Sequence, residues 1–355
     1  MDTQQRFLPS VFWVQFLAGA PLYSLTDQQE IIMKLNVTGL DDTIMNDGTA
    51  KNGKGGTERM REELMRRLPD DMKDQFNIIC SRVRDVPENK KNILWLHDVW
   101  NDSENAHLKE AGSIDRFEKL VFVSNSQAQA YRMVYDIPHS KSIVLRNAIE
   151  IFKPLEKEKT DTLRLIYHTT PHRGLEILYP VFAHLYEQYN QENGVKLELD
   201  VYSNFDIYGW PQRNEQYENL YELCRQHPGI NYHGTVSNEE VREALVHAHI
   251  FAYPNIWEET SCIAAIEAMS AKVAIVCPNY GALAETTGNL ATAMYPWSED
   301  INAHANQFAN VLSAVINNYW HEGLQSKLTF GKTYTDNIHD WDSRIEEWMS
   351  MLKSF

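Results

Sequence analysis

Short runs rich in aliphatic and β-branched residues recur along the chain, separated by longer stretches whose apolar residues follow a helical period. This alternation is typical of parallel sheets that are covered by helices. In the first half, the predicted strands are residues 31–37, 76–80, 93–96, 120–124 and 142–145. In the second half, they are residues 163–167, 197–202, 230–232, 250–253 and 273–277. We therefore expect an α/β protein with one open sheet in each half.

The amphipathic stretches between these strands predict the covering helices. They include residues 57–68, 127–134, 175–189, 238–246, 261–270 and 341–352. Between the two sets of strands lies a charged segment, residues 151–161, which is either a surface loop or an interdomain hinge. Its position between two sheet-forming halves favours the hinge.

The composition limits the kinds of molecule that the protein is expected to bind. The chain has 355 residues, a length suited to two α/β domains, and 43% of them are hydrophobic, enough for two cores. The 49 acidic residues outnumber the 33 Lys and Arg residues, which gives a formal net charge of −16. Such a surface repels phosphate backbones and anionic headgroups, so we expect neither nucleic acid nor strong membrane binding. A bound nucleotide remains compatible, because a pocket can be positive inside an acidic protein.

The cysteines point to a reducing compartment. The four of them (Cys80, Cys224, Cys262 and Cys277) show no CxxC pairing and no histidines at metal-ligand spacing. We therefore expect buried thiols and no structural zinc. The apolar run 11–22 is too short to span a bilayer, so a cytoplasmic location is the expectation.

The strongest candidate for chemistry is the segment 254–271, which follows a predicted strand and enters a helix of small and aliphatic residues. Thr260 or Ser261 is expected to cap this helix, so that the free amides of its first turn face the strand ends. A helix N-terminus of this kind binds anions such as a diphosphate. Glu259 lies just before the helix and Glu267 two turns inside it. A buried helix with an acidic cap is the alternative, since Glu pairs at this spacing often arise by chance.

Other candidates lie at a second strand end and in a glycine-rich loop. Arg173 follows the predicted strand 163–167, and an arginine there can bind phosphate oxygens in bidentate fashion, although a surface arginine is the simpler interpretation. The loop 53–58 opens a helix with Gly55 and Gly56. It matches neither the Walker A nor the Rossmann glycine pattern, so it indicates only a close approach of the backbone.

His97 and Asp98 follow the predicted strand 93–96 in the first half. Open α/β sheets place ligands at this edge, which favours a functional role. A lone buried histidine that is satisfied by the backbone is nevertheless the commoner case.

Together these segments resemble the retaining glycosyltransferases of the GT-B fold, and glycosyltransferase family 4 in particular. The spacing of Glu259 and Glu267, followed by residues 268–269, is similar to the Glu-x7-Glu signature of that family. Residues 278–285 resemble its glycine-containing loop ending in Glu, and residues 233–236 resemble its His-Gly-x-Val turn near the nucleotide base.

The resemblance is specific in the second half and looser in the first. Arg173 and Gly174 match a basic residue followed by glycine in similar enzymes, which often carry another arginine five positions earlier. This chain has His168 at that earlier position. The departure leaves one fixed positive charge where many relatives have two.

The resemblance implies two Rossmann-like domains with parallel sheets that face each other across a cleft. We expect an N-terminal acceptor domain at residues 31–152, to which the C-terminal helix 340–355 returns. The donor domain is expected at residues 153–339, and residues 1–30 form an extension without an assigned role.

The resemblance also implies roles for individual residues. Glu259 and His97 are expected to be catalytic, and Asp98 to bind the acceptor. The expected donor-binding residues are Gly55, Gly56, His168, Arg173, Gly174, Val236, Thr260, Ser261, Cys262, Ile263 and Glu267. No metal site and no cofactor beyond the nucleoside-diphosphate sugar are expected.

The function implied is retaining, metal-independent transfer of a sugar from a nucleotide-sugar donor to a glycan or another hydroxyl acceptor. The leading alternative is a two-domain nucleotide- or sugar-binding protein without catalysis. A nucleotide-sugar epimerase or a phosphorylase on the same scaffold is a further alternative, although a phosphorylase would normally need a pyridoxal lysine.

Overall fold

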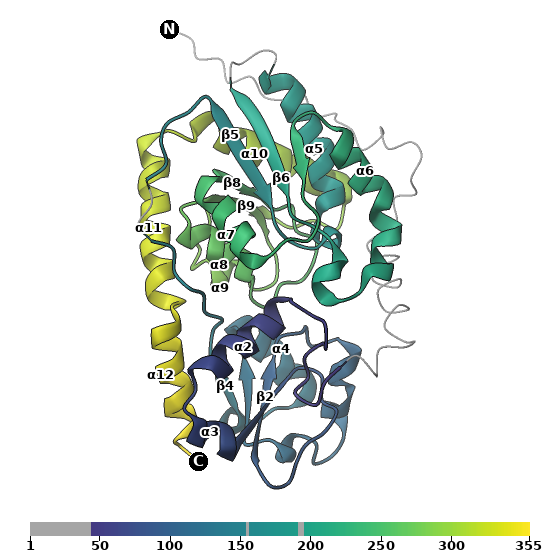
Figure 1. The fold of residues 1–355 in the computed structure, drawn as a ribbon, viewed down its shortest axis with the longest axis vertical. Coiled ribbons are helices and arrows are strands. Elements are labelled where there is room, and N and C mark those ends of the chain that lie inside the picture. The colour runs from purple at the N-terminus through teal and green to yellow at the C-terminus, as the bar shows by residue number, and fades with distance from the viewer. Residues whose placement is uncertain (1–43, 154–155, 191–194) are drawn as a thin grey trace.

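The computed structural model describes residues 44–153, 156–190 and 195–355, which form two α/β units stacked along the long axis of the molecule (Figure 1). The predicted strand 31–37 and the extension 1–30 lie outside the described residues. The first unit contains a parallel sheet in the order β1-β2-β3-β4. Its strands are β1 (Phe76–Cys80), β2 (Lys91–Leu96), β3 (Lys119–Phe122) and β4 (Ser142–Val144).

The second unit contains a parallel sheet of six described strands in the order β10-β9-β8-β5-β6-β7. The strands are β5 (Thr162–Tyr167), β6 (Lys196–Val201), β7 (Ile230–Tyr232), β8 (Ile250–Ala252), β9 (Ala274–Asn279) and β10 (Ala293–Pro296). Both sheets are open and parallel, which confirms the predicted fold class. The edge strand β10 was not predicted, because it has only four residues, ends in a proline and buries only Tyr295.

Helices cover both sheets (Figure 1). Around the first sheet lie α2 (Gly56–Arg67), α3 (Asp70–Gln75) and α4 (Asn125–Tyr135). Those of the second unit are α5 (Leu175–Gln188), α6 (Glu218–Gln226), α7 (Asn238–His247), α8 (Ile263–Ser270), α9 (Leu283–Thr286), α10 (Ile301–Asn318) and α11 (Glu322–Ile338). The last helix, α12 (Trp341–Leu352), has the bounds predicted from its amphipathic pattern.

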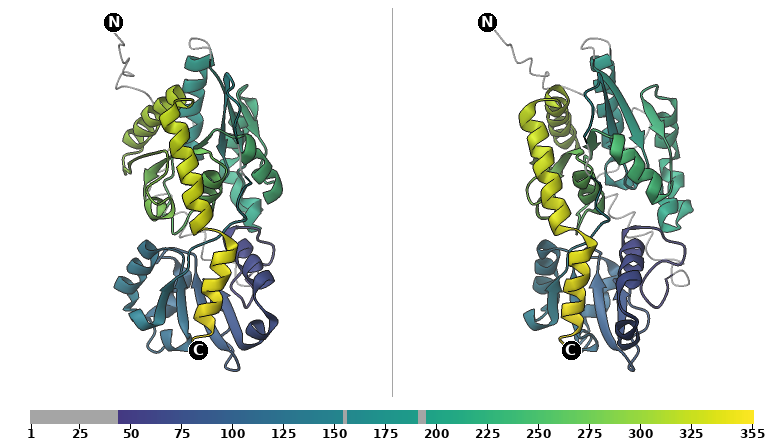
Figure 2. Two further views of the ribbon diagram at one scale, coloured as in Figure 1. Left: turned by 90° about the vertical axis from the view of Figure 1, so that its left-hand side faces the viewer. Right: turned by 60° about the vertical axis from the view of Figure 1, so that its left-hand side comes forward.

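Alternation along β2 builds two separate cores in the first unit. Ile93 and Trp95 point to one face of the sheet, whereas Leu94 and Leu96 point to the other, as the period of a strand requires. The first face is covered in part by α12, whose Trp348 is fully buried with its ring centroid 4.9 Å from that of Trp95. Figure 2 shows α11 running along the second unit and leading into α12 on the first. The end of the chain thus ties the two units together.

We predict that Trp348→Ala weakens this tie. Loss of a buried indole leaves a cavity between α12 and the first sheet and should lower the free energy of unfolding by about 3–5 kcal/mol. Urea unfolding followed by circular dichroism measures the change. Glu346→Ala on the exposed face of α12 is the matched control. A loss below about 1 kcal/mol would show that the helix does not depend on this contact.

Candidate active site

A buried ion pair joins two strand ends of the second unit. Arg173 follows β5 in a short 3-10 turn, and its guanidinium donates to Glu259, which lies in the loop after β8. The Tyr253 hydroxyl donates to the same carboxylate. Gly174 has φ +116, and a Cβ there would lie 2.2 Å from the carbonyl oxygen of Pro254, so only glycine fits beside the arginine. Two strand ends are therefore held together through charge and close backbone contact.

The electrostatics keep Arg173 charged and Tyr253 protonated. Burial opposes the charge on Arg173, but Glu259 outweighs it and raises the arginine pKa well above its ordinary value. Burial and the charge of Glu259 likewise raise the pKa of Tyr253, so its hydroxyl stays protonated and donates. A fixed, desolvated pair of this kind is costly to break, because either partner alone would be an uncompensated charge.

Glu267 lies on the buried face of α8 and accepts from two arginines. Arg242 of α7 approaches its Oε1 at 3.4 Å through Nη1. Arg59 of α2, in the first unit, donates from Nη1 at 2.9 Å to the same oxygen and at 2.6 Å to Asn238 Oδ1. Glu267 thus forms part of a polar contact between the two units.

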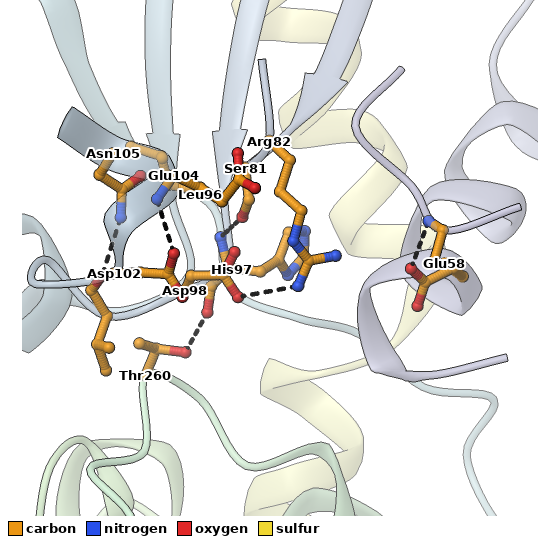
Figure 3. A network of polar contacts seen from close by, with 12 residues as sticks. Glu58, Ser81, Arg82, Leu96, His97, Asp98, Asp102, Glu104, Asn105 and Thr260 are labelled. Atoms are coloured by element: carbon orange, nitrogen blue, oxygen red, sulfur yellow. Dashed lines mark hydrogen bonds and ion pairs between the residues drawn. The ribbon is translucent and has the colours of Figure 1, made fainter. Parts of the chain in front are cut away.

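The start of α8 differs from the prediction. The helix begins at Ile263, four residues after Glu259, with Cys262 as the N-cap and no side-chain capping hydrogen bond. Neither Thr260 nor Ser261 caps it. The Thr260 hydroxyl instead donates to the carbonyl oxygen of His97 at 2.6 Å, reaching across to the first unit (Figure 3). Because α8 starts later than predicted, Glu267 lies little more than one turn inside it.

His97 and Asp98 lie at the carboxyl end of β2 and face Thr260 (Figure 3). The His97 amide donates to Ser81 Oγ at 2.8 Å, and burial lowers the pKa of its imidazole to about 4. Asp98 Oδ1 lies 3.9 Å from Arg82. His97 Nε2 and Asp98 Oδ2 are buried without a hydrogen-bond partner among the described residues. Both atoms therefore keep unused hydrogen-bonding capacity.

The glycine-rich loop packs between the two units. A Cβ at Gly55 would lie 2.4 Å from the Tyr208 ring, and one at Gly56 would lie 3.0 Å from Ile263 Cδ1. The backbone of this loop therefore lies against the N-terminus of α8, where the anion site was predicted. The Lys54 amide also donates to the Ile207 carbonyl at 2.6 Å.

The remaining predicted donor residues line the same edge of the second sheet. His168 follows β5, with its ring 4.5 Å from that of Phe251, and burial lowers its pKa to about 4. It is therefore neutral near pH 7. Val236 lies in the turn between β7 and α7, three residues after His233, whose ring stacks on Tyr202 at 4.3 Å.

A cavity of about 190 Å³ lies between the two units. The first unit contributes the loop after β2 and the start of α4, and the second unit contributes the loops after β8 and β9. The lining residues are Val99, Trp100, Ser126, Gln127, Ala130, Glu258, Glu259, Thr260, Gly281 and Ala282. Burial raises the pKa of Glu258. Trp100 and Glu258 were not predicted, since nothing in their sequence neighbourhood shows that the two loops meet.

Glu285, in the short helix α9 that follows β9, forms another contact that was not predicted. Its carboxylate accepts from the amides of Asn125 and Ser126, at 2.8 and 2.9 Å, and from both side chains. Arg146 lies 3.6 Å away. A carboxylate of the second unit thus occupies the N-terminus of α4 in the first, where backbone amides and the helix dipole favour an anion.

Neither metal ligands nor membrane spans stand out. No group of three or more His, Cys, Asp or Glu side chains in the described ranges has the arrangement to hold a metal ion. Asp340 and Asp342 form an Asp-x-Asp sequence at the start of α12. The Asp340 carboxylate caps this helix by accepting a hydrogen bond from the Ser343 amide. Within the part of the chain that the structure describes, every helix is too short or too polar to cross a bilayer. All four cysteines are buried as free thiols.

The comparisons with known proteins agree with this geometry. Residues 147–317, which contain the Arg173–Glu259 pair and Glu267, match the family described as glycosyl transferases group 1. The chain is a glycosyltransferase. A search of curated protein sequences found no match.

Solved structures of similar fold are GT-B glycosyltransferases, which gives the described part of this chain the GT-B fold. A glycosyltransferase from Rickettsia africae superposes with a TM-score of 0.58 at 14% identity, covering 84% of this chain and 80% of that one. WaaG, a glycosyltransferase involved in lipopolysaccharide biosynthesis, gives 0.60 at 12% identity, covering 84% and 96%. HepE of Anabaena, in complex with UDP-glucose, gives 0.57 at 11% identity, covering 75% and 73%.

We predict that the Glu285 contact stabilises this glycosyltransferase in a pH-dependent way. Burial would raise the pKa of Glu285, but the hydrogen bonds from Asn125 and Ser126 outweigh it and lower the pKa below the ordinary 4.5. The stabilisation is therefore present at pH 7 and is lost as the pH falls through the lowered pKa. Glu285→Gln should cost about 1–2 kcal/mol at pH 7 and less at about pH 4.

Urea unfolding of both proteins at the two pH values measures this difference. Glu299→Gln, an exposed carboxylate before α10, is the control and should change little at either pH. A deficit of Glu285→Gln that is equal at both pH values would contradict a charge-dependent contact.

Proposed function

We propose that this glycosyltransferase transfers a sugar from a nucleoside-diphosphate sugar to a hydroxyl acceptor, with retention of configuration and without a metal ion. The observation that carries the proposal is the placement of Arg173 and Glu259 at neighbouring strand ends, and of Glu267 on the following helix α8, in the domain that matches the family. These groups provide a cation for the diphosphate and two carboxylates for sugar hydroxyls.

The donor is proposed to lie along the strand ends of the second sheet. Its diphosphate would bind near the amides at the start of α8 and the Arg173 guanidinium, which supplies bidentate donors. The ribose hydroxyls would bind Glu267, and the transferred sugar would bind Glu259 and His97. The solved complex of HepE with UDP-glucose supports a donor of this chemical class.

Catalysis would rest on stabilising the charge that develops as the donor breaks. The acceptor oxygen forms a bond to the anomeric carbon while the bond from that carbon to the phosphate oxygen breaks. The electron pair stays on the phosphate oxygen, which also takes the proton of the acceptor hydroxyl. Arg173 and the helix amides bind the growing negative charge, so electrostatic preorganisation takes the place of a metal ion. Attack from the face of the leaving group retains configuration.

The acceptor is proposed to be a glycan or another small hydroxyl compound in the cavity between the two units. Trp100 offers an aromatic wall, and Glu258 and Ser126 offer polar groups. Asp98, next to Val99 of this lining, would bind the acceptor if its unpartnered oxygen became accessible. The net charge of −16 disfavours a nucleic acid acceptor or a strongly anionic membrane surface.

Donor binding is tested by thermal unfolding with UDP, GDP and ADP in the presence of EDTA. We expect one diphosphate at about a hundred times its Kd to stabilise the wild type by about 2.7 kcal/mol. Glu267→Ala should lose this shift, because the ribose hydroxyls lose their acceptor. If none of the three diphosphates shifts the midpoint, the proposed donor site is wrong.

Turnover separates the enzyme from a non-catalytic sugar-binding protein. We expect Glu259→Gln to release nucleoside diphosphate from a nucleotide-sugar panel about a hundredfold more slowly than wild type, with little change in diphosphate affinity. Glu243→Gln, an exposed carboxylate on α7, serves as the control. A Glu259→Gln protein with wild-type turnover would remove Glu259 from the chemistry.

A further inference from the structure

The strand ends of the second unit supply little net positive charge for a diphosphate. Arg173 is already paired with Glu259. His168, which replaces an arginine found in similar enzymes, is neutral near pH 7, because burial lowers its pKa to about 4. A diphosphate leaving group carries two or more negative charges, so additional cationic help is expected from elsewhere.

Arg59 is placed to provide this additional positive charge. It lies in the first turn of α2, three residues after Gly56, whose backbone abuts Ile263 at the N-terminus of α8. The guanidinium donates to Glu267, on the same helix α8, and to Asn238, at 2.9 and 2.6 Å. The side chain is 22% exposed, so it is accessible to water.

Glu267 does not need Arg59 for charge balance. Arg242 approaches the same carboxylate oxygen at 3.4 Å, and its position is fixed by a 2.8 Å hydrogen bond to the Glu150 carbonyl. Its guanidinium also lies 3.9 Å from the centroid of the Phe152 ring. One arginine is enough to neutralise one carboxylate. The second guanidinium therefore leaves a local excess of positive charge beside the predicted diphosphate position.

We propose that Arg59 is a catalytic residue that leaves Glu267 when the donor binds and donates to the diphosphate. This inference rests on the proposed function. The ribose hydroxyls then donate hydrogen bonds to the Glu267 carboxylate in place of Arg59. The path is short, because Glu267 and Ile263 are four residues apart on α8, about 6 Å along the helix axis. Arg59 belongs to the first unit and Glu267 to the second. Donor binding would therefore replace the direct Arg59–Glu267 ion pair with a contact between the two units that runs through the donor.

The test compares ligands with and without phosphates. Kd is measured by calorimetry for UDP, GDP and ADP, and then for the nucleoside of the diphosphate that wild type binds most tightly. We expect Arg59→Met to weaken diphosphate binding about tenfold to a hundredfold, with nucleoside binding unchanged or tighter. The diphosphate Kd of Arg59→Lys should fall between those of wild type and Arg59→Met, because a lysine keeps the charge but not the bidentate geometry.

Arg66→Met is the matched control, because Arg66 lies on the same helix and is exposed. Far-UV circular dichroism checks that each variant is folded. Equal weakening of nucleoside and diphosphate would overturn the inference and make Arg59 structural. Tightening of both would also overturn it, because Arg59 would then only compete for Glu267. If wild type binds no diphosphate, the proposed function itself fails, whatever the variants do.

Discussion

The site depends on the buried pair of Arg173 and Glu259. A desolvated guanidinium requires a carboxylate, and the two lie 86 positions apart in sequence, so β5 and β8 must end side by side. Glycines allow this approach. Gly174 leaves room for the Pro254 carbonyl, and Gly281 leaves room for the backbone of Glu259, which a Cβ would approach within 2.5 Å. Once the loop after β8 is fixed in this way, Thr260 projects toward the first unit.

The two units meet through polar groups rather than through one continuous apolar core. Thr260 reaches His97, Glu267 reaches Arg59, and Glu285 reaches the N-terminus of α4. Each contact joins a loop or helix of the second unit to a strand end or helix start of the first. Polar interfaces of this kind exchange partners with water or a ligand at modest cost, whereas a buried apolar interface does not.

The fold, and the position of the candidate residues Arg173, Glu259 and His97 after strands, could be predicted because both depend on local pattern. Nine of the predicted strands fall in the described residues, and each corresponds to a strand within two residues at either end. The partners could not be predicted, because they depend on how two sheets face each other. Thr260 illustrates the limit. Its hydroxyl suits a helix cap, but it donates a hydrogen bond to the carbonyl oxygen of His97, 163 residues away in sequence, instead. Arg59 and Glu267 are 208 residues apart, and no spacing rule connects them.

The unpaired polar atoms indicate what the cleft is built to hold. His97 Nε2, Asp98 Oδ2 and His168 Nε2 are buried at strand ends without partners in the described residues, although burial of such atoms normally costs about 1–3 kcal/mol each. Both histidines are neutral near pH 7, so each ring offers one donor and one acceptor nitrogen rather than a charge. A sugar is rich in hydroxyls that donate and accept, and it suits such atoms better than an ion does. Under the proposed function, recognition of charge would fall to the arginines, so that the sugar and the diphosphate would be recognised by different groups.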